Sequence, residues 1–189
     1  FKCDFIYWIN TELLSSSVNK IYKRGLITEL YPENMSFGED LVFVLNYLKH
    51  CNRISFTQEP LYQHEVYNSV SLTHSFSPAR FSNLEDIQKA ILDFADDKNK
   101  INPRIYDKYV KDALHLTRMW YKNKNVPYIR KKEIIGEWLK QSYIRKLKIS
   151  DYQLHWKDRM LLHCLHMSCF IGINLIVNGK EYINSLSKE

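Results

Sequence analysis

Residues 36–51, SFGEDLVFVLNYLKHC, carry the clearest secondary-structure signal in the chain. Apolar residues recur there at the spacing i, i+3, i+4 and i+7, which lines one face of a helix: Leu41, Val44, Leu45 and Leu48. This pattern predicts a helix over residues 38–50. Glu39 and Asp40 fall in its first turn, where each acid stabilises the partial positive charge of the helix end by about 0.3–1 kcal/mol and needs no further role.

The sequence on both sides of this helix favours extended structure. Residues 1–9 are aromatic and have high β-propensity, and residues 15–27 read as a short strand that leads into a turn of helix. Residues 53–67 alternate apolar and polar side chains, break at Pro60 and then resume, as a strand, a kink and a second strand do. These patterns predict a segment of mixed helix and strand up to about residue 76.

After Pro78 the pattern is helical throughout. Amphipathic stretches follow at residues 83–97, 104–123, 130–147 and 155–186. The last of them contains Gly172, where we expect the helix to break. We therefore expect an α+β, mostly helical fold in two parts. Residues 1–76 would contain the strands, and residues 77–189 would be all helical.

Composition excludes several kinds of site. The 189 residues include only 5 glycines, and neither G-x-G-x-x-G nor G-x-x-x-x-G-K occurs, so no glycine-rich phosphate loop is expected. The 4 cysteines are spaced for neither a zinc ribbon nor a disulfide scaffold, which suits a reducing compartment. His163, His166 and Cys169 lie close together in sequence. No second group of ligands accompanies them, so we expect core residues there and no metal.

The net charge is +6, and the densest basic run is at residues 130–132. Such a run indicates either a solvated helix face or a surface that meets the phosphates of a nucleic acid or a membrane. Residues 160–177 are largely apolar but contain polar side chains, and Trp156 and Lys157 precede them. This stretch favours a buried or interfacial helix over a membrane-spanning one.

Four motifs stand in order around Glu39 and Asp40. They are Asn19-Lys20-x-Tyr22-Lys23-Arg24, Phe37-Gly38-Glu39-Asp40 continuing to Phe43, Pro60-Leu61-Tyr62, and Asn68-Ser69-Val70-Ser71. Over residues 10–75 this series resembles the second half of the catalytic domain of a family 2 glycosyltransferase of the GT-A type. The resemblance implies that residues 1–76 form the C-terminal, acceptor-side part of a GT-A-like α/β domain. Residues 77–189 would then form a helical C-terminal region.

The resemblance implies an inverting transfer of a sugar from a nucleotide-sugar donor to a glycan or lipid-linked acceptor, as in bacterial polysaccharide biosynthesis. Asp40 would be the general base, which must lie within hydrogen-bond reach of the acceptor hydroxyl and opposite the leaving group. Glu39 would orient the site or contact the acceptor. The residues implied to line the substrate site are Lys20, Tyr62, His64 and Ser69. His64 stands where the family has a basic residue that contacts the diphosphate or the metal.

The family places its nucleotide-binding half, with a metal-binding Asp-x-Asp motif, upstream of these motifs. No Asp-x-Asp occurs in this chain, and Asp96-Asp97 lacks the spacer residue. The resemblance therefore implies a divalent cation, Mg²⁺ or Mn²⁺, whose ligands lie mostly outside this chain. It also implies a fragment that is inactive without the donor-binding half. The expected location is cytoplasmic, at the inner face of the membrane, with a peripheral contact made by the helical tail.

A second hypothesis belongs to a different class of protein. Glu39 and Asp40 would then mark only a helix start, and the chain would be a helical protein-interaction or nucleic-acid-binding module without catalytic activity. A nucleic-acid-binding version would use the basic run at residues 130–132. The 13 tyrosines are spread along the chain and do not alternate with basic residues in an RNA-binding manner, so nucleic acid is not the favoured partner.

Overall fold

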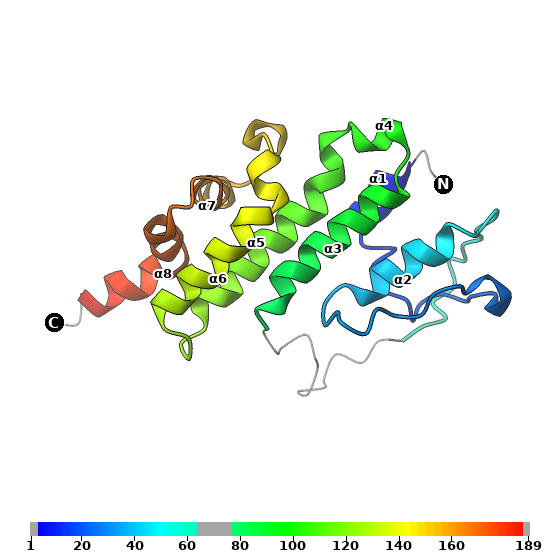
Figure 1. The fold of residues 1–189 in the computed structure, drawn as a ribbon, viewed down its shortest axis with the longest axis horizontal. Helices are drawn as coiled ribbons and strands as arrows, with labels where there is room; N and C mark the ends of the chain where they lie inside the picture. Colours follow the sequence, from blue (N-terminus) through cyan, green and yellow to red (C-terminus); the bar gives the residue numbers. More distant parts are fainter. Residues whose placement is uncertain (1–3, 64–76, 187–189) are drawn as a thin grey trace. The chain divides into compact units, whose positions relative to one another are not determined.

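The computed structural model describes residues 4–63 and 77–186, with side chains described up to Gly179. Within these ranges every regular element is helical. The chain divides into two compact units, Phe1–Lys108 and Tyr109–Glu189, and Figure 1 labels their α-helices. The boundary that the sequence predicts, between residues 76 and 77, falls at the edge of a stretch outside the described residues and stays a prediction.

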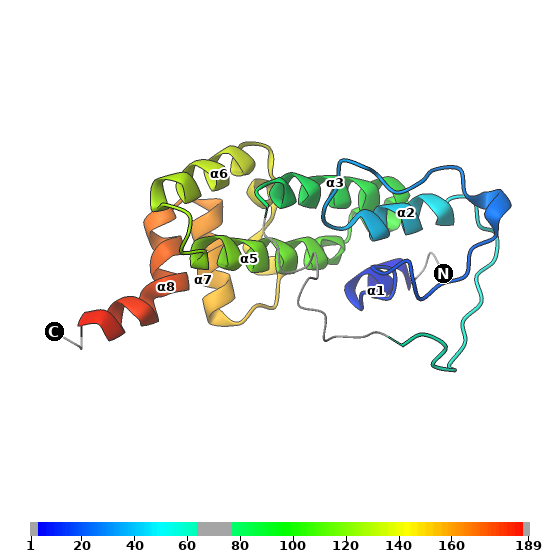
Figure 2. The same cartoon turned by 90° about the horizontal axis from the view of Figure 1, so that it is seen from below.

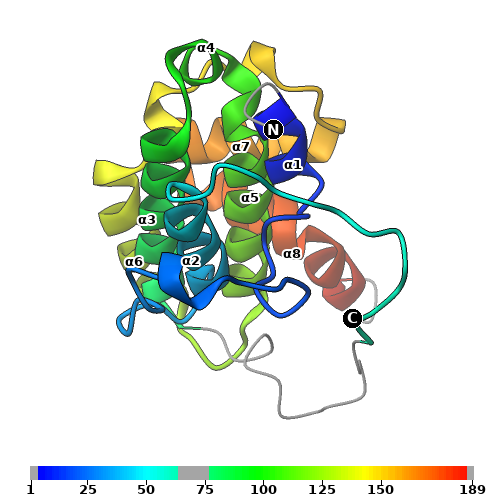
Figure 3. The same ribbon diagram turned by 90° about the vertical axis from the view of Figure 1, so that its right-hand side faces the viewer.

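The first unit is built around two helices that pack side by side. Its elements are α1 (Phe5–Asn10), η2 (Arg24–Leu26), α2 (Glu39–Leu48), α3 (Ala79–Phe94), α4 (Asp97–Lys100) and η4 (Pro103–Tyr106), where η marks a 3-10 helix. Figures 1 and 3 show α2 lying along α3. The helix predicted over residues 38–50 is therefore confirmed, at Glu39–Leu48.

The core of this unit comes from the apolar stripes of α1, α2 and α3. Its members are Phe5, Ile9, Leu41, Val44, Leu45, Ile87, Ile91 and Phe94, among others. Truncation of a buried Leu or Ile in such a core to Ala typically costs about 2–5 kcal/mol. Gly38 precedes α2 with φ +76°, and a Cβ built on it would lie 2.1 Å from Ile87 Cδ1. Glycine at this position therefore lets the start of α2 approach α3.

The strand predictions are wrong for the residues that the structure describes. The aromatic stretch predicted as extended forms helix α1, because Phe5 and Ile9, four residues apart, bury together on one helical face. Residues 20–23 and 52–63 contain no strand either. A strand needs a neighbouring strand to pair its backbone groups. The described residues supply no such neighbour. The mostly helical class is therefore confirmed for them, whereas the α/β part of the predicted fold is not shown.

The second unit is a set of packed helices. It contains α5 (Asp107–Lys122) from Tyr109 onward, α6 (Tyr128–Gln141), η5 (Tyr143–Lys146), η6 (Ile149–Asp151), α7 (Trp156–His166) and α8 (Phe170–Leu186). Its buried side chains include Tyr109, Trp120, Ile135, Trp138, Leu161, Leu165 and Ile173. Among the described residues, no helix combines the length and the apolar character that crossing a membrane requires.

The break predicted at Gly172 lies elsewhere. The chain leaves α7 at Met167 and enters α8 at Phe170, and Figure 2 shows the two helices. Ser168, which lies between them, has φ 54°. Gly172 is helical, and a Cβ there would lie 2.7 Å from Cys164 Sγ. The glycine therefore allows α7 and α8 to pack closely, and the left-handed residue at 168 makes the turn.

Candidate functional site

The two predicted acids occupy the first turn of α2. Asp40 is half-buried, and its Oδ1 accepts a hydrogen bond of 2.5 Å from the hydroxyl of Ser17. Ser17 is itself buried. A buried hydroxyl that bonds one carboxylate oxygen fixes the rotation of the side chain and leaves the second oxygen for another partner.

The segment before residue 24 is fastened against α2 by aromatic and polar contacts. Tyr22 donates its hydroxyl proton to the backbone carbonyl of Ser17 at 3.0 Å, and its ring packs edge-on against Phe43 and Tyr47 at centroid distances of 5.2 and 4.9 Å. The backbone N–H of Lys23 donates to the Tyr47 hydroxyl at 2.8 Å. These contacts hold the predicted Asn-Lys-x-Tyr motif beside Asp40.

Lys20 lies close enough to Asp40 for their charges to interact. Burial lowers the pKa of the Lys20 ammonium, and the negative charge of Asp40 opposes that shift. Its Nζ donates to Asn19 Oδ1 at 2.7 Å and to the carbonyl of Ser16. The structure therefore brings together two of the predicted residues. We call Ser17, Lys20, Tyr22 and Asp40 the Asp40 cluster.

Tyr22 stays protonated in this cluster. Burial raises the pKa of its phenol most, and the nearby Tyr31, Asp40 and Tyr47 raise it further. The hydroxyl therefore remains a hydrogen-bond donor at neutral pH, as its bond to the Ser17 carbonyl requires.

Glu39 faces a different neighbour. Arg80 of α3 is only 5% exposed, and burial lowers the pKa of its guanidinium while the charge of Glu39 opposes that shift. The guanidinium carbon also lies 5.6 Å from the centre of the Phe37 ring. The two adjacent acids therefore diverge, with Asp40 interacting with the segment at residues 17–22 and Glu39 with α3.

Of the other predicted substrate residues, only Tyr62 falls within the described residues. Tyr62 lies exposed in the segment that follows Pro60. His64 and Ser69 lie outside the described residues. Sequence reasoning missed Ser17 and Arg80. The run of three serines before Lys20 could have suggested the first, whereas Arg80 is distant in sequence and only the packing of α3 on α2 reveals it.

The acids of α2 do not form a set of ligands for a divalent cation. A lysine stands beside Asp40, and Glu39 interacts with an arginine, whereas Mg²⁺ or Mn²⁺ prefers several oxygen ligands around one point. Within residues 4–63 and 77–186, no three His, Cys, Asp or Glu side chains converge on a metal position. His163 and Cys169 are exposed, so the expectation of core residues there was wrong for these two.

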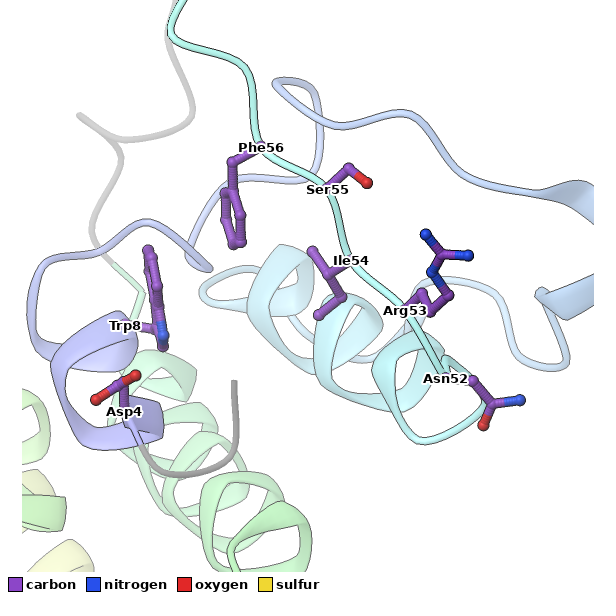
Figure 4. Close-up of a pocket in the computed structure, with 7 residues that line it drawn as sticks. All are labelled: Asp4, Trp8, Asn52, Arg53, Ile54, Ser55 and Phe56. Carbon is purple, nitrogen blue, oxygen red and sulfur yellow. The ribbon is translucent and has the colours of Figure 1, made fainter.

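A cavity of about 380 Å³ lies between α1 and the segment that follows α2 (Figure 4). Its lining residues are Asp4, Trp8, Asn52, Arg53, Ile54, Ser55 and Phe56. The rings of Trp8 and Phe56 stack with centroids 4.9 Å apart and an interplanar angle of 9°. An aromatic pair beside a carboxylate, an amide and a guanidinium suits a small polar ligand that also has an apolar face.

The first unit thus offers a positioned carboxylate and a mixed aromatic and polar cavity. The carboxylate belongs to the Asp40 cluster, and the cavity opens beside Trp8. No protein-family model, no curated protein and no solved structure matches this chain.

Proposed function

We propose that this chain is the acceptor-side part of an inverting glycosyltransferase of family 2, with Asp40 as its general base. The observation that carries the proposal is the setting of Asp40, a half-buried carboxylate at a helix start with one oxygen held by Ser17. A general base has to be fixed in position before the substrate arrives, because misplacement by 1 Å can cost about 100-fold in rate. The Ser17 hydrogen bond holds the Asp40 carboxylate in this way.

The reaction follows from the second oxygen of Asp40. The acceptor hydroxyl gives its proton to this oxygen while its own oxygen attacks the anomeric carbon. The bond from that carbon to the nucleoside diphosphate breaks, and its electron pair leaves with the phosphate oxygen. Attack opposite the leaving group inverts the anomeric centre, and Asp40 afterwards loses the proton to solvent.

The remaining residues have supporting roles in this proposal. Lys20 supplies a positive charge beside the base. Glu39 is a positioning residue, which interacts with Arg80 and so holds the start of α2 against α3. Tyr62, His64 and Ser69 keep the substrate-binding roles that the family resemblance implies.

The nucleotide-sugar donor and the divalent cation belong to a part of the protein beyond these residues. Bound Mg²⁺ or Mn²⁺ would stabilise the leaving diphosphate, but neither acid of α2 is placed to hold it. Extended segments with exposed apolar side chains support a larger GT-A sheet in the complete domain. Ile21 is 96% exposed, and pairing with a further strand would cover it.

We place a sugar ring of the acceptor in the cavity beside Trp8. The face of an aromatic ring carries negative charge and attracts the C–H face of a sugar, while carboxylates, amides and guanidinium groups bond its hydroxyls. Phe56 offers an exposed ring for the contact with the C–H face of the sugar. The cavity also has polar groups that can bond the sugar hydroxyls, on Asp4, Asn52 and Arg53.

The deciding experiment is Asp40→Asn in the complete enzyme, assayed by release of nucleoside diphosphate. Loss of a general base typically lowers the rate by about 10²–10⁴-fold. Asparagine can still accept the Ser17 hydrogen bond, so the free energy of unfolding should change little. The matched control is Asp93→Asn, an exposed acid of α3. Transfer that survives Asp40→Asn would remove Asp40 as the base and leave the helical binding module as the better account.

A further inference from the structure

The two units differ sharply in charge. Residues 1–108 contain 12 Lys and Arg against 14 Asp and Glu, a net charge of −2. Residues 109–189 contain 15 Lys and Arg against 7 Asp and Glu, a net charge of +8. The positive charge of the protein therefore belongs to the second unit, which should attract anionic partners.

Helix α7 exposes two apolar side chains that lie between two basic ones. Its buried side chains are Leu161, Leu162 and Leu165. On the opposite face, Trp156 is 59% exposed and Met160 lies one turn further on, also exposed. At 100° per residue, Lys157 and Arg159 fall on either side of this pair. The Lys157 ammonium lies 5.3 Å from the centre of the Trp156 ring.

The chain that follows repeats the pattern. Met167, in the turn after α7, is exposed, and so are Ile171 and Leu175, which lie one turn apart on α8. Cations from other elements of the same unit lie beside this region. Lys132 of α6 has its ammonium 5.7 Å from the centre of the Phe170 ring, and the guanidinium of Arg145 donates to Ser168 Oγ at 2.9 Å.

We propose that this surface binds the face of a membrane that contains anionic lipids. By the α7–α8 surface we mean the exposed apolar side chains of the two helices and the turn between them, which are Trp156, Met160, Met167, Ile171 and Leu175, with the cations named above. Tryptophan is favoured at the headgroup level, and Met, Ile and Leu can enter the acyl boundary while Lys and Arg meet lipid phosphates. Single exposed apolar residues need no explanation, but these occur along two consecutive helices and among cations in the basic unit.

A membrane explains more of this surface than a nucleic acid does. The phosphates of a lipid headgroup and those of a nucleic acid would both be attracted by the net charge of +8 of the second unit. Of these two partners, only a lipid phase gives exposed Met, Ile and Leu side chains an apolar environment. The inference does not depend on catalysis by the first unit, because every residue that carries it lies in the second.

The test is co-sedimentation of the chain with phosphatidylcholine vesicles, with and without phosphatidylglycerol. We expect binding only with the anionic lipid and weakening with salt. Lys157→Glu with Arg159→Glu should lower the affinity at least tenfold. Lys89→Glu with Lys98→Glu, an equal charge change at exposed positions of the first unit, should leave most binding intact. Equal losses in the two variants, or no binding, would overturn the proposal.

Apolar variants separate lipid from nucleic acid. Met160→Gln with Leu175→Gln should weaken vesicle binding several-fold, whereas Ile101→Gln, at an exposed apolar position of the first unit, should not. The same proteins are titrated with a DNA duplex at the same salt concentration. Tighter binding to DNA than to vesicles, unaffected by the Gln substitutions, would make nucleic acid the partner. Circular dichroism checks that each variant keeps its helices.

Discussion

The hydroxyl of Ser17 donates a 2.5 Å hydrogen bond to Oδ1 of Asp40, and this contact joins the segment before Lys20 to the first turn of α2. The two residues lie 23 positions apart in sequence, and both are at least half-buried. The bond therefore serves the fold and the proposed chemistry together. It holds a segment of turns and bends onto a helix, and it orients the carboxylate.

Ser17→Ala removes this bond and should destabilise the protein. A hydrogen bond to a charged group contributes about 1.5–3 kcal/mol, and the lower end applies because Asp40 is only half-buried. The loss should appear as a lower midpoint in urea unfolding. Ser82→Ala is the control, since the Ser82 hydroxyl is exposed and bonds only the carbonyl of Ala79 within its own helix. Equal midpoints for the two variants would show that the bond adds nothing to stability.

Gly38→Ala should be more harmful than its size suggests. The residue has φ +76°, which L side chains rarely adopt, and the new Cβ would lie 2.1 Å from Ile87 Cδ1. Backbone strain of about 1 kcal/mol adds to overpacking of about 1–3 kcal/mol. Thermal unfolding measures the sum. Gly25→Ala has open space around its Cβ and should change stability by less than about 1 kcal/mol. A tolerated Gly38→Ala would mean that α2 can shift away from α3.

Sequence periodicity was sufficient in the longer helices, where an apolar stripe continues over several turns. The stripe of α2 and the helices after Pro78 were predictable for that reason. Residues 4–10 were not, because Trp8 and its aromatic neighbours favour strands intrinsically while burial of Phe5 and Ile9 selects a helix. The turn at Ser168 escaped prediction because a serine, and not the usual glycine, adopts the left-handed backbone after α7.

The residues of the candidate site also divide into those that the sequence could predict and those that it could not. Asp40 and Lys20 were predictable because they belong to an ordered series of motifs. Their partners were not, because Ser17 and Arg80 reach α2 through tertiary contacts that leave no spacing signal in the sequence. The cavity beside Trp8 also joins separate segments, so only the folded chain reveals it.

The burial of Lys131 should make the free energy of unfolding depend on pH in the alkaline range. Its ammonium is buried and donates to the Tyr121 carbonyl at 2.7 Å, and burial lowers its pKa below 10.5. Between the lowered pKa and 10.5 the unfolded chain binds more protons than the folded chain. The contribution of Lys131 to the free energy of unfolding therefore rises with pH in that window. Unfolding in urea from neutral pH to pH 10.5, compared with Lys131→Met, isolates this effect. A difference between the two proteins that is constant with pH would contradict it.

Phe56→Ala tests the cavity as an acceptor site in the complete enzyme. The ring stacks on Trp8 at 4.9 Å and is 63% exposed, so its removal takes away a binding surface without opening a hole in the core. If the acceptor sugar packs there in both ground and transition states, KM for the acceptor should rise several-fold while kcat stays nearly constant. Leu30→Ala, at another exposed apolar position of the same unit, should change neither constant. A fall in kcat with unchanged KM would place the acceptor elsewhere and give Phe56 a role in positioning the reacting groups.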